Sequence, residues 1–250
     1  MKRRRRNICL KVAYDGTNYH GFQRQSPPVV AVQNVLEERL KLIFGDTIEL
    51  AAAGRTDAGV HAYGQVVNFF TDGRIPLERI CRAAEGVLPP DIVIKDAWEA
   101  DFDFSARHSA KGKTYIYRIV RGETMNPFWR FYAWYIKQPL DIGAMKMALA
   151  ETVGEHDFSS FRAAGGVPMS PVRRIYEAEL VEKSAELVEI KIHGNGFLYH
   201  MVRNIVGTLA DVGKGRRSVE DFRRIMAQRD RNYASPTAPA EGLYLLSVDY

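Results

Sequence analysis

Apolar residues recur along the chain with two spacings, and each spacing predicts one kind of element. Short apolar runs between turn residues predict strands, whereas apolar residues three and four positions apart predict helices. In the first half the pattern predicts strands over residues 8–14, 48–53, 65–70 and 91–98, and helices over residues 30–44 and 76–87. The resulting order is β-α-β-β-α-β, a split βαβ arrangement.

The second half loosely repeats this order. Strands are predicted over residues 113–120, 172–181, 187–193 and 243–248, an extended aromatic stretch over 129–136, and helices over 142–153, 200–212 and 219–227. Residues 101–106 are the expected crossing between the halves. We therefore predict an α+β fold with an N-terminal domain of residues 1–106 and a C-terminal domain of residues 107–250.

Length and composition exclude several classes of protein. The 250 residues are enough to bury a core. The two cysteines, Cys9 and Cys81, form no CxxC pair, which argues against a disulfide framework or a structural zinc site and favours a reducing compartment. No apolar run approaches the ~20 residues of a membrane span, and the N-terminus lacks the apolar region of a signal peptide. We expect a cytoplasmic protein without membrane contact.

Basic residues gather in clusters although the formal net charge is only +5. The clusters are Lys2, Arg3, Arg4, Arg5 and Arg6; Arg107, His108, Lys111, Lys113, Arg118 and Arg121; Arg173 and Arg174; and Lys214, Arg216, Arg217, Arg223 and Arg224. Such clusters suit a polyanionic partner, because each phosphate contact releases condensed counterions. Each of them also fits solvated surface charge.

The stretch AAAGRTDAGVHAYGQVVNF, residues 51–69, holds one carboxylate between an arginine and two glycines. If GRTD is extended, Arg55 and Asp57 face the same way and can pair, which keeps the carboxylate ionised and oriented. The glycines let a backbone or a planar ligand approach closely. A carboxylate held in this way can act as a nucleophile or a general base. The alternative is an Asx-turn, in which Asp57 bonds its own backbone.

A metal site is a weaker alternative for the same stretch. Asp57 and His61 are four residues apart, which suits two ligands on a helix, but Gly59 between them disfavours a helix. The sequence shows no further cluster of histidines or carboxylates that would supply a third ligand. We therefore expect no metal.

The strand KTYIYRI, residues 113–119, combines tyrosines with basic residues. Exposed aromatic side chains flanked by lysine and arginine stack bases on many RNA-binding sheets. The same alternation also fits a face of Tyr115, Tyr117 and Ile119 that packs in a core. From the residues alone the two interpretations are equal.

The stretch GNGFLYHMVRNIVGTL, residues 194–209, predicts the end of a strand at its glycines and then an amphipathic helix. Arg203 lies off the apolar stripe of this helix. An arginine in so apolar a setting needs a carboxylate partner, for which Asp57 is a candidate, because an unpaired buried charge is strongly destabilising. The alternative is that its long side chain extends to solvent.

Five motifs in this order resemble the TruA-type tRNA pseudouridine synthase family. They are VAYDGTNYHGFQRQ, GRTDAGVHA, FSARHSAKGKTYIYRI, HGNGFLYHMVRNIVGTL and TAPAEGLYLLSVDY, and together they span nearly the whole chain. With the element order, the resemblance implies two related split-βαβ domains, ferredoxin- or RRM-like, around a mixed, mainly antiparallel sheet. It also implies a homodimer that uses no metal and no organic cofactor.

The resemblance implies an activity, the isomerisation of uridine to pseudouridine at positions 38, 39 and 40 in the anticodon stem-loop of tRNA. Asp57 is then expected to be the nucleophile, and Arg55 to help flip the target base or hold the vacated position. Tyr115 is expected to stack on the flipped uracil, and Arg203 to pair with the catalytic carboxylate. The candidates for contacts with tRNA phosphates are Arg24, Arg107, Lys111 and Lys113.

Two other functions fit the residues without the resemblance. One is a non-catalytic RNA-binding protein, but a pure binder gains nothing from the Asp57 carboxylate in a phosphate-binding cleft. The other is an enzyme that uses a carboxylate on a small molecule. Its substrate affinity would depend little on salt, whereas RNA binding weakens as salt rises.

Overall fold

The structure, a computed structural model, describes residues 5–166 and 169–250. Lys2, Arg3 and Arg4 of the N-terminal basic cluster lie outside the described residues. The chain forms two compact units: the first runs to Lys111 and includes Tyr244–Tyr250, and the second comprises Gly112–Leu243. The sequence analysis divided the chain once, after residue 106, and that domain boundary stays a prediction.

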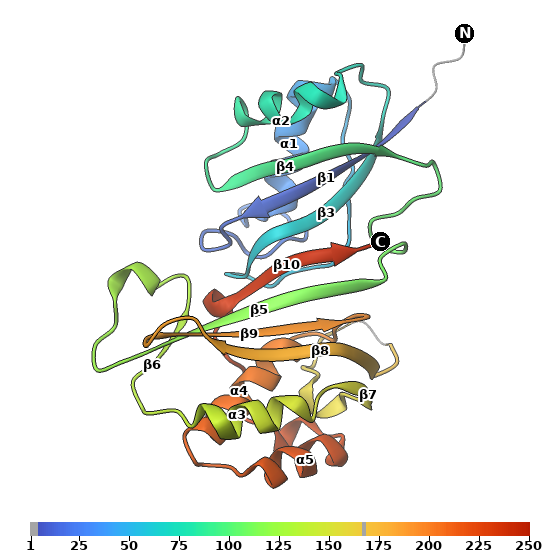
Figure 1. The fold of residues 1–250 in the computed structure, drawn as a ribbon. Helices are drawn as coiled ribbons and strands as arrows, with labels where there is room; N and C mark the ends of the chain where they lie inside the picture. Colours follow the sequence, from blue (N-terminus) through green and yellow to red (C-terminus); the bar gives the residue numbers. More distant parts are fainter. Residues whose placement is uncertain (1–4, 167–168) are drawn as a thin grey trace. The chain divides into compact units, whose positions relative to one another are not determined.

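The first unit is a sheet with two helices on one face (Figure 1). Its elements are β1 (Arg6–Tyr14), α1 (Val32–Phe44), β2 (Ala51–Ala52), β3 (His61–Thr71), α2 (Leu77–Glu85), β4 (Ile92–Ala100) and most of β10 (Leu243–Asp249). The strands lie in the order β4-β1-β3, and β2 also pairs with β3. Strand β1 is antiparallel to both of its neighbours, whereas β10 pairs with the start of β3 in parallel. The sheet is therefore mixed and has the split βαβ order that the sequence predicts.

Alternation along β3 gives this sheet two packed faces. Phe69 points toward α1, where its ring meets that of Phe44 edge-on at a centroid distance of 5.0 Å. Val66 has the opposite parity and packs in an apolar cluster on the other face. The members of this cluster are Ala53, Val66, Trp98, Phe104, Ala106, Val248 and Tyr250.

The second unit repeats part of this arrangement (Figure 1). Its elements are β5 (Gly112–Arg121), β6 (Trp134–Ile136), α3 (Ile142–Ala150), β7 (Gly154–Asp157), β8 (Val172–Glu182), β9 (Leu187–Gly194), α4 (Met201–Gly213) and α5 (Val219–Gln228). The strand order is β5-β9-β8-β7, with β6 parallel to the end of β5. Strand β9 lies antiparallel between β5 and β8, as β3 lies between β1 and β2 in the first unit. This shared order supports two related units.

The predicted α+β class is thus confirmed, although several bounds differ: β3 begins at His61 and not at residue 65, and α3 ends at Ala150 and not at residue 153. The strand predicted over residues 48–53 is only Ala51–Ala52. The aromatic stretch is extended only at Trp134–Ile136, because Asn126 caps a 3-10 turn at Pro127–Trp129 by accepting a hydrogen bond from the Phe128 N–H. Strand β7 was not predicted, because its sequence, GEHD, shows no apolar alternation.

The cysteines and the helices bear on the excluded classes. Both cysteines are free thiols, and burial raises the pKa of Cys9 to about 12, so that this thiol packs as a small apolar side chain. Among the described residues, every helix is too short or too polar to cross a bilayer. In the same part of the chain, no three His, Cys, Asp or Glu side chains gather as a metal site requires.

Buried polar side chains tie α4 to the segment that follows α5. Asn204 is fully buried in α4. Its Nδ2 donates to the Phe161 carbonyl at 2.8 Å. Its Oδ1 accepts from the Thr237 hydroxyl at 2.6 Å and from Nη2 of Arg231 at 3.2 Å. These three bonds fix the helix that carries Arg203.

Replacing Asn204 by leucine should destabilise the protein more than removing one of its partners. Asn204→Leu removes the three bonds of a buried amide, and we expect a loss of about 2–3 kcal/mol in the free energy of unfolding. That loss corresponds to roughly 5–10 °C in melting temperature for a chain of this size. Thr237→Val removes the bond to Asn204 and a 3.2 Å bond from Arg231 at a half-buried position, and should cost about 1–1.5 kcal/mol. Thermal unfolding checks both values, and equal shifts would contradict the assignment.

Candidate active site

The stretch GRTDAGV forms a loop between β2 and β3 that is neither helix nor strand. The Val60 N–H donates to the Asp57 carbonyl at 3.1 Å and closes a β-turn. Gly59 has a φ of +76°, whereas Ala58 shares the negative φ of nearly all described non-glycine residues, so the turn is of type II. Asp57 is therefore the first residue of a β-turn, whereas the Asx-turn considered from the sequence stays a prediction. The bond that closes the turn uses main-chain atoms and not the carboxylate.

Side chains alternate along the extended half of this loop. Thr56 is buried, whereas Arg55 is exposed and Asp57 is half-buried. Arg55 and Asp57 thus leave the loop on the side away from the core, as residues i and i+2 of an extended segment do. Both are on the accessible side of the loop, where a substrate can reach them.

The segment that follows β1 holds this loop in place. The Phe22 N–H donates to the Thr56 carbonyl at 3.0 Å, and the Gly59 N–H donates to the Tyr19 carbonyl at 3.2 Å. Gly21 has a φ of +85°, and a Cβ on it would lie 2.6 Å from the Thr56 carbonyl oxygen. Glycine alone meets both the backbone conformation and the close approach.

The end of the loop is held where β3 begins. The Gly16 N–H donates to Nδ1 of His61 at 3.0 Å, and the same nitrogen lies 3.1 Å from Oδ1 of Asp15. A Cβ on Gly16 would lie 2.0 Å from the Val60 carbonyl oxygen. Since His61 is buried and engaged with Asp15 and Gly16, it is poorly placed to share a metal with Asp57.

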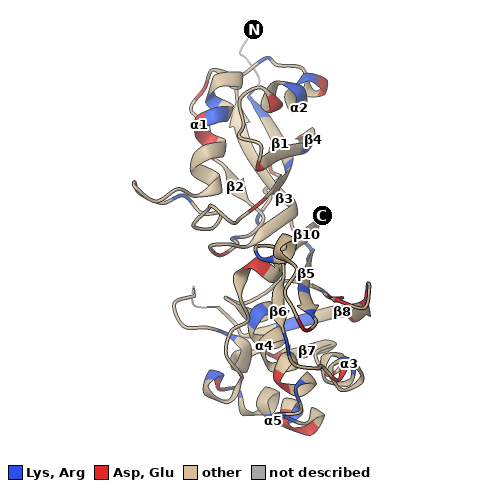
Figure 2. Ribbon diagram, turned by 90° about the vertical axis from the view of Figure 1, so that its left-hand side faces the viewer, with Lys and Arg blue, Asp and Glu red and all other residues tan. Residues whose placement is uncertain are grey.

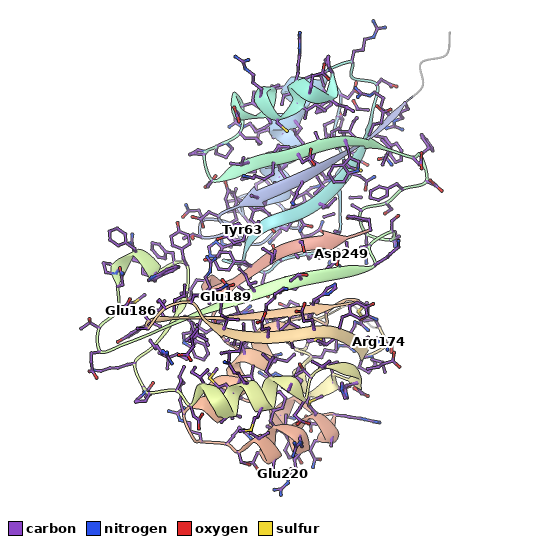
Figure 3. The ribbon with its side chains drawn as sticks, viewed as in Figure 1. Tyr63, Arg174, Glu186, Glu189, Glu220 and Asp249 are labelled. Carbon is purple, nitrogen blue, oxygen red and sulfur yellow. The ribbon has the colours of Figure 1, made fainter. Side chains whose placement is uncertain are left out.

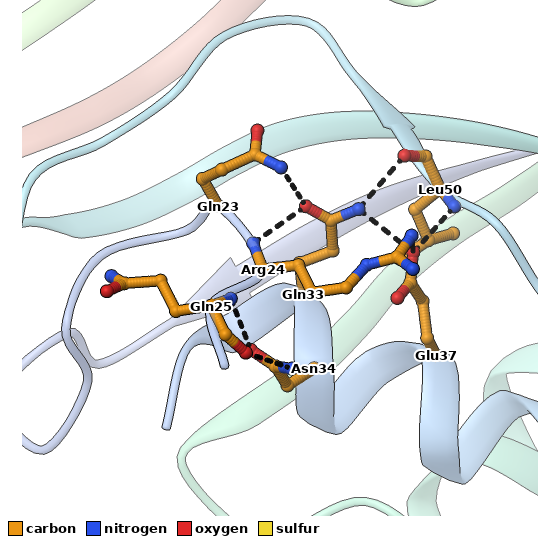
Figure 4. A network of polar contacts seen from close by, with 7 residues as sticks. All are labelled: Gln23, Arg24, Gln25, Gln33, Asn34, Glu37 and Leu50. Carbon is orange, nitrogen blue, oxygen red and sulfur yellow. Dashed lines mark hydrogen bonds and ion pairs between the residues drawn. The ribbon is translucent and has the colours of Figure 1, made fainter. Parts of the chain in front are cut away.

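Arg24 lies in a polar network between the loop after β1 and helix α1 (Figure 4). Its Nη2 is 2.9 Å from Oε1 of Glu37, an oxygen that also accepts from the Gln33 side chain and the Leu50 N–H at 2.9 Å each. Oε1 of Gln33 accepts in turn from the Gln23 side chain and the Arg24 N–H. The charge of Arg24 is therefore balanced by a carboxylate, although its side chain is 48 % exposed.

Arg107 and Lys111 are the other predicted phosphate contacts of the first unit. Both side chains are exposed, and neither forms an ion pair with any residue that the structure describes. Their charges are thus available to an anionic ligand. Lys113, the fourth candidate, is the second residue of β5 in the second unit and is half-buried.

Carboxylates balance much of the remaining basic clusters. Arg223 on α5 forms ion pairs with Glu151 and Glu220. Figure 2 shows both basic (blue) and acidic (red) residues on this helix. On β5, Arg118 pairs with Glu189 of β9, which Figure 3 labels, at 3.3 Å. For the basic cluster at residues 214–224, the ion pairs of Arg223 favour the interpretation as solvated surface charge.

Tyr115 lies on β5 in the second unit. It is 8 % exposed, and its ring meets that of Phe197 edge-on at a centroid distance of 5.0 Å. Tyr117 is fully buried, and its hydroxyl donates to the Pro239 carbonyl at 2.8 Å. Ile119 is fully buried as well, and Tyr115 counts as buried although it retains a small exposed fraction, so the structure favours the core interpretation for this face of β5.

Arg203 lies in the first turn of α4 and is half-buried. Its Nε donates to the Ala238 carbonyl at 2.8 Å, and the Ala238 N–H donates to the Arg203 carbonyl at 3.1 Å. These reciprocal bonds fix the direction of the guanidinium group. The side chain is therefore held by the protein instead of extending into solvent.

The sequence model of one family matches most of the chain. That family is described as tRNA pseudouridine synthase, and its model matches residues 11–109 and 148–250. The matched residues include Asp57 and its supporting segment, as well as Arg203, whereas Tyr115 lies between the two matched ranges. The chain belongs to the tRNA pseudouridine synthase family. As a member of this family the protein is an isomerase.

Curated relatives agree with this assignment. The chain is 48 % identical over 244 residues to tRNA pseudouridine synthase A of Lacticaseibacillus casei (strain BL23), covering 96 % of this chain and 98 % of the relative. It is 44 % identical over 245 residues to tRNA pseudouridine synthase A of Thermoanaerobacter sp. (strain X514), covering 98 % and 100 %. A solved structure, titled "Crystal structure of the archaeal box H/ACA sRNP Nop10-Cbf5 complex", matches with a TM-score of 0.35 and 16 % identity over 79 % of this chain and 45 % of that chain.

The sequence analysis missed the side chains that support the Asp57 loop of the synthase from within the core. Gln65 is fully buried, and its Nε2 donates to the Gly54 carbonyl at 2.8 Å. The Tyr14 hydroxyl lies 2.7 Å from the Thr56 hydroxyl. The signal in the sequence was a polar side chain in each of two apolar strands, Tyr14 in β1 and Gln65 in β3. That signal does not reveal the partner, which lies about forty residues away for the tyrosine.

Gly21→Ala should destabilise the synthase more than Gly45→Ala. Both glycines have a positive φ, which costs an alanine ~1–2 kcal/mol. A Cβ on Gly45 meets open space, but one on Gly21 meets the Thr56 carbonyl and should add ~1–3 kcal/mol of overpacking. Urea unfolding of the two variants measures the difference. A Gly21→Ala variant as stable as Gly45→Ala would show that the loop moves freely away from Gly21.

Proposed function

We propose that this synthase isomerises uridine to pseudouridine at positions 38, 39 and 40 in the anticodon stem-loop of tRNA, with Asp57 as the nucleophile and the target base flipped out of its stack. Membership of the family supports uridine isomerisation in tRNA. The observation that carries the role of Asp57 is its place on a loop that neighbouring segments hold, with its half-buried side chain on the same side as the exposed Arg55.

The chemistry needs little besides one positioned carboxylate. The bond between N1 and C1′ breaks, a bond between C5 and C1′ forms, C5 releases its hydrogen as a proton, and N1 takes up a proton. No electrons and no group enter from outside, so the reaction requires no organic cofactor. The carboxylate adds to C6 of the base or to C1′ of the sugar. Either route places one ionised oxygen at ~3–3.5 Å from the reacting carbon, which a rigid loop supports.

Three further side chains have proposed roles around the flipped base. Tyr115 stacks on the uracil and returns ~1–3 kcal/mol of the energy that flipping costs. Arg55 helps to displace the base from its stack or holds the vacated position. Arg203 pairs with the Asp57 carboxylate and keeps it ionised. The Ala238 bond that directs Arg203 and the Phe197 ring beside Tyr115 support such fixed positions.

Basic side chains are proposed to bind the tRNA backbone. Lys111 and Arg107 are the better candidates, because their charges are exposed and carry no ion pair with the described residues. Arg24 and Lys113 are retained as candidates. Contacts to phosphates position RNA by shape, which suits an enzyme that accepts several neighbouring uridines. The proposed assembly is a homodimer that acts in the cytoplasm, where tRNA is the substrate.

Replacing Asp57 by asparagine should abolish turnover and leave tRNA binding intact. The measurement is release of tritium from tRNA labelled at C5 of uridine, because formation of the C5–C1′ bond expels that hydrogen. Asp103→Asn is the matched control, since it removes an exposed carboxylate of the same unit outside the loop. We expect wild type and Asp103→Asn to release tritium and Asp57→Asn to release none.

The other outcomes separate the alternatives. Release by Asp57→Asn would remove the nucleophile assignment. Binding of tRNA without release by wild type would favour a protein that only binds RNA. Mapping of the pseudouridines formed in wild-type reactions tests the three proposed positions directly.

Salt dependence should distinguish the phosphate candidates. Lys111→Gln should reduce the slope of log affinity against log salt by about 0.7–0.9, the value for one phosphate contact. Arg24→Gln should reduce it less, because Glu37 already balances the Arg24 charge. Lys146→Gln, on the exposed side of α3, is the control for a change in net charge alone. Equal slope changes for Lys111→Gln and Lys146→Gln would remove Lys111 from the RNA contacts.

A further inference from the structure

A buried polar group lies directly beneath the loop of Asp57. Its members are Tyr14 at the end of β1, Thr56 in the loop and Gln65 in β3, which are 4 %, 7 % and 0 % exposed. The Tyr14 and Thr56 hydroxyls are 2.7 Å apart, and the Gln65 side chain donates to the Gly54 carbonyl. The loop is thus anchored to the core on both sides of Arg55, through Gly54 and through Thr56.

Burial keeps the tyrosine in its hydrogen-bonding form. It raises the pKa of the Tyr14 phenol well above the ordinary value, although hydrogen bonds with Thr56 and Gln65 oppose the rise. The phenol therefore stays neutral at neutral pH. A neutral hydroxyl pair can exchange donor and acceptor roles without moving either oxygen.

The peptide planes on both sides of Asp57 are fixed by hydrogen bonds. The plane before it carries the Thr56 carbonyl, which accepts from the Phe22 N–H, and the plane after it carries the Asp57 carbonyl, which accepts from the Val60 N–H. Because peptide planes are rigid, fixing both of them fixes the direction in which the Asp57 side chain leaves the backbone. The Thr56 side chain sets the first plane, since its branched Cβ restricts χ1 and its hydroxyl is held by Tyr14.

We propose that the buried Tyr14–Thr56 hydroxyl pair is a positioning device for catalysis, which aims the Asp57 carboxylate at the reacting carbon. Neither hydroxyl touches the substrate, and each acts through the backbone of the loop. The inference rests on the proposed role of Asp57 and adds residues to it. A displacement of ~1 Å at a reacting group lowers a rate about 100-fold, so a small tilt of the loop is enough to be measured.

A purely structural role predicts a different pattern. Any buried hydroxyl pair stabilises the protein, and its loss lowers the melting temperature wherever it lies. A positioning role also lowers kcat while KM for tRNA stays unchanged, because the RNA-binding surface is intact. The two roles therefore differ in whether kcat falls further than the loss of stability explains.

The test compares variants at the pair with matched variants elsewhere in the first unit. Tyr14→Phe and Thr56→Val each remove one hydroxyl of the pair, and Thr56→Ser retains it. Tyr250→Phe removes a hydroxyl that donates to the Ala106 carbonyl at 2.9 Å. Thr71→Val removes a buried hydroxyl bonded to Asp46 at 2.6 Å at the far end of β3. Each protein is assayed for kcat and KM by tritium release from tRNA and for melting temperature.

We expect Tyr14→Phe and Thr56→Val to lower kcat by about 10- to 100-fold with KM within about twofold of wild type. Thr56→Ser should lie within about threefold of wild type, and the double variant should be no slower than the slower single variant, since both remove one interaction. Tyr250→Phe and Thr71→Val should lose comparable stability and keep kcat.

Wild-type kcat in Tyr14→Phe, or kcat that follows melting temperature alike in all variants, would overturn the positioning role while leaving the proposed function intact. Failure of wild type to release tritium, or release by Asp57→Asn, would overturn the proposed function, and this inference with it. If Tyr14→Phe does not fold, Thr56→Ser against Thr56→Val decides, and equal kcat in these two variants would overturn the inference.

Discussion

The register between β1 and β3 is the constraint on which the position of the Asp57 loop depends. Tyr14 pairs with Ala62 and Val12 with Gln65, so two steps along β1 match three along β3 at this end of the strands. Such irregularities re-aim side chains beside functional sites. Here the irregularity lies at Tyr14, whose hydroxyl contacts that of Thr56 in the loop before β3. A slip of one residue would turn the apolar face of β3 away from α1 and separate that hydroxyl pair.

In the second unit, different contacts hold the backbone that carries a proposed site residue. Helix α4 is locked by the buried amide of Asn204, which bonds three groups from two other segments. The backbone of Ala238 then directs the guanidinium of Arg203 through a pair of reciprocal bonds. In both units the proposed site residues sit on backbone whose conformational entropy is lost during folding, so little remains to be lost when RNA binds.

The sequence predicted the elements well and the supporting contacts poorly. Apolar periodicity located α1, β3, α4 and the β8–β9 hairpin because one face of each is buried. It failed at GEHD, where no alternation exists, and at the aromatic run after Asn126, where a capped turn overrides strand propensity. The common direction of the exposed Arg55 and the half-buried Asp57 followed from their spacing of two residues. The Tyr14 partner of Thr56 did not, because a contact across about forty residues leaves no local trace in a single sequence.

The close approach of Gly16 to Val60 has a consequence for how this protein can change over time. A single added carbon on Gly16 would overlap the Val60 carbonyl, and one on Gly21 would overlap that of Thr56. The segment after β1 and the Asp57 loop are therefore in direct main-chain contact and are joined by hydrogen bonds, although they lie far apart in the chain. An insertion, a deletion or a bulky replacement in one stretch therefore needs a compensating change in the other. The two stretches should evolve together, while the sequences of the surrounding helices vary independently.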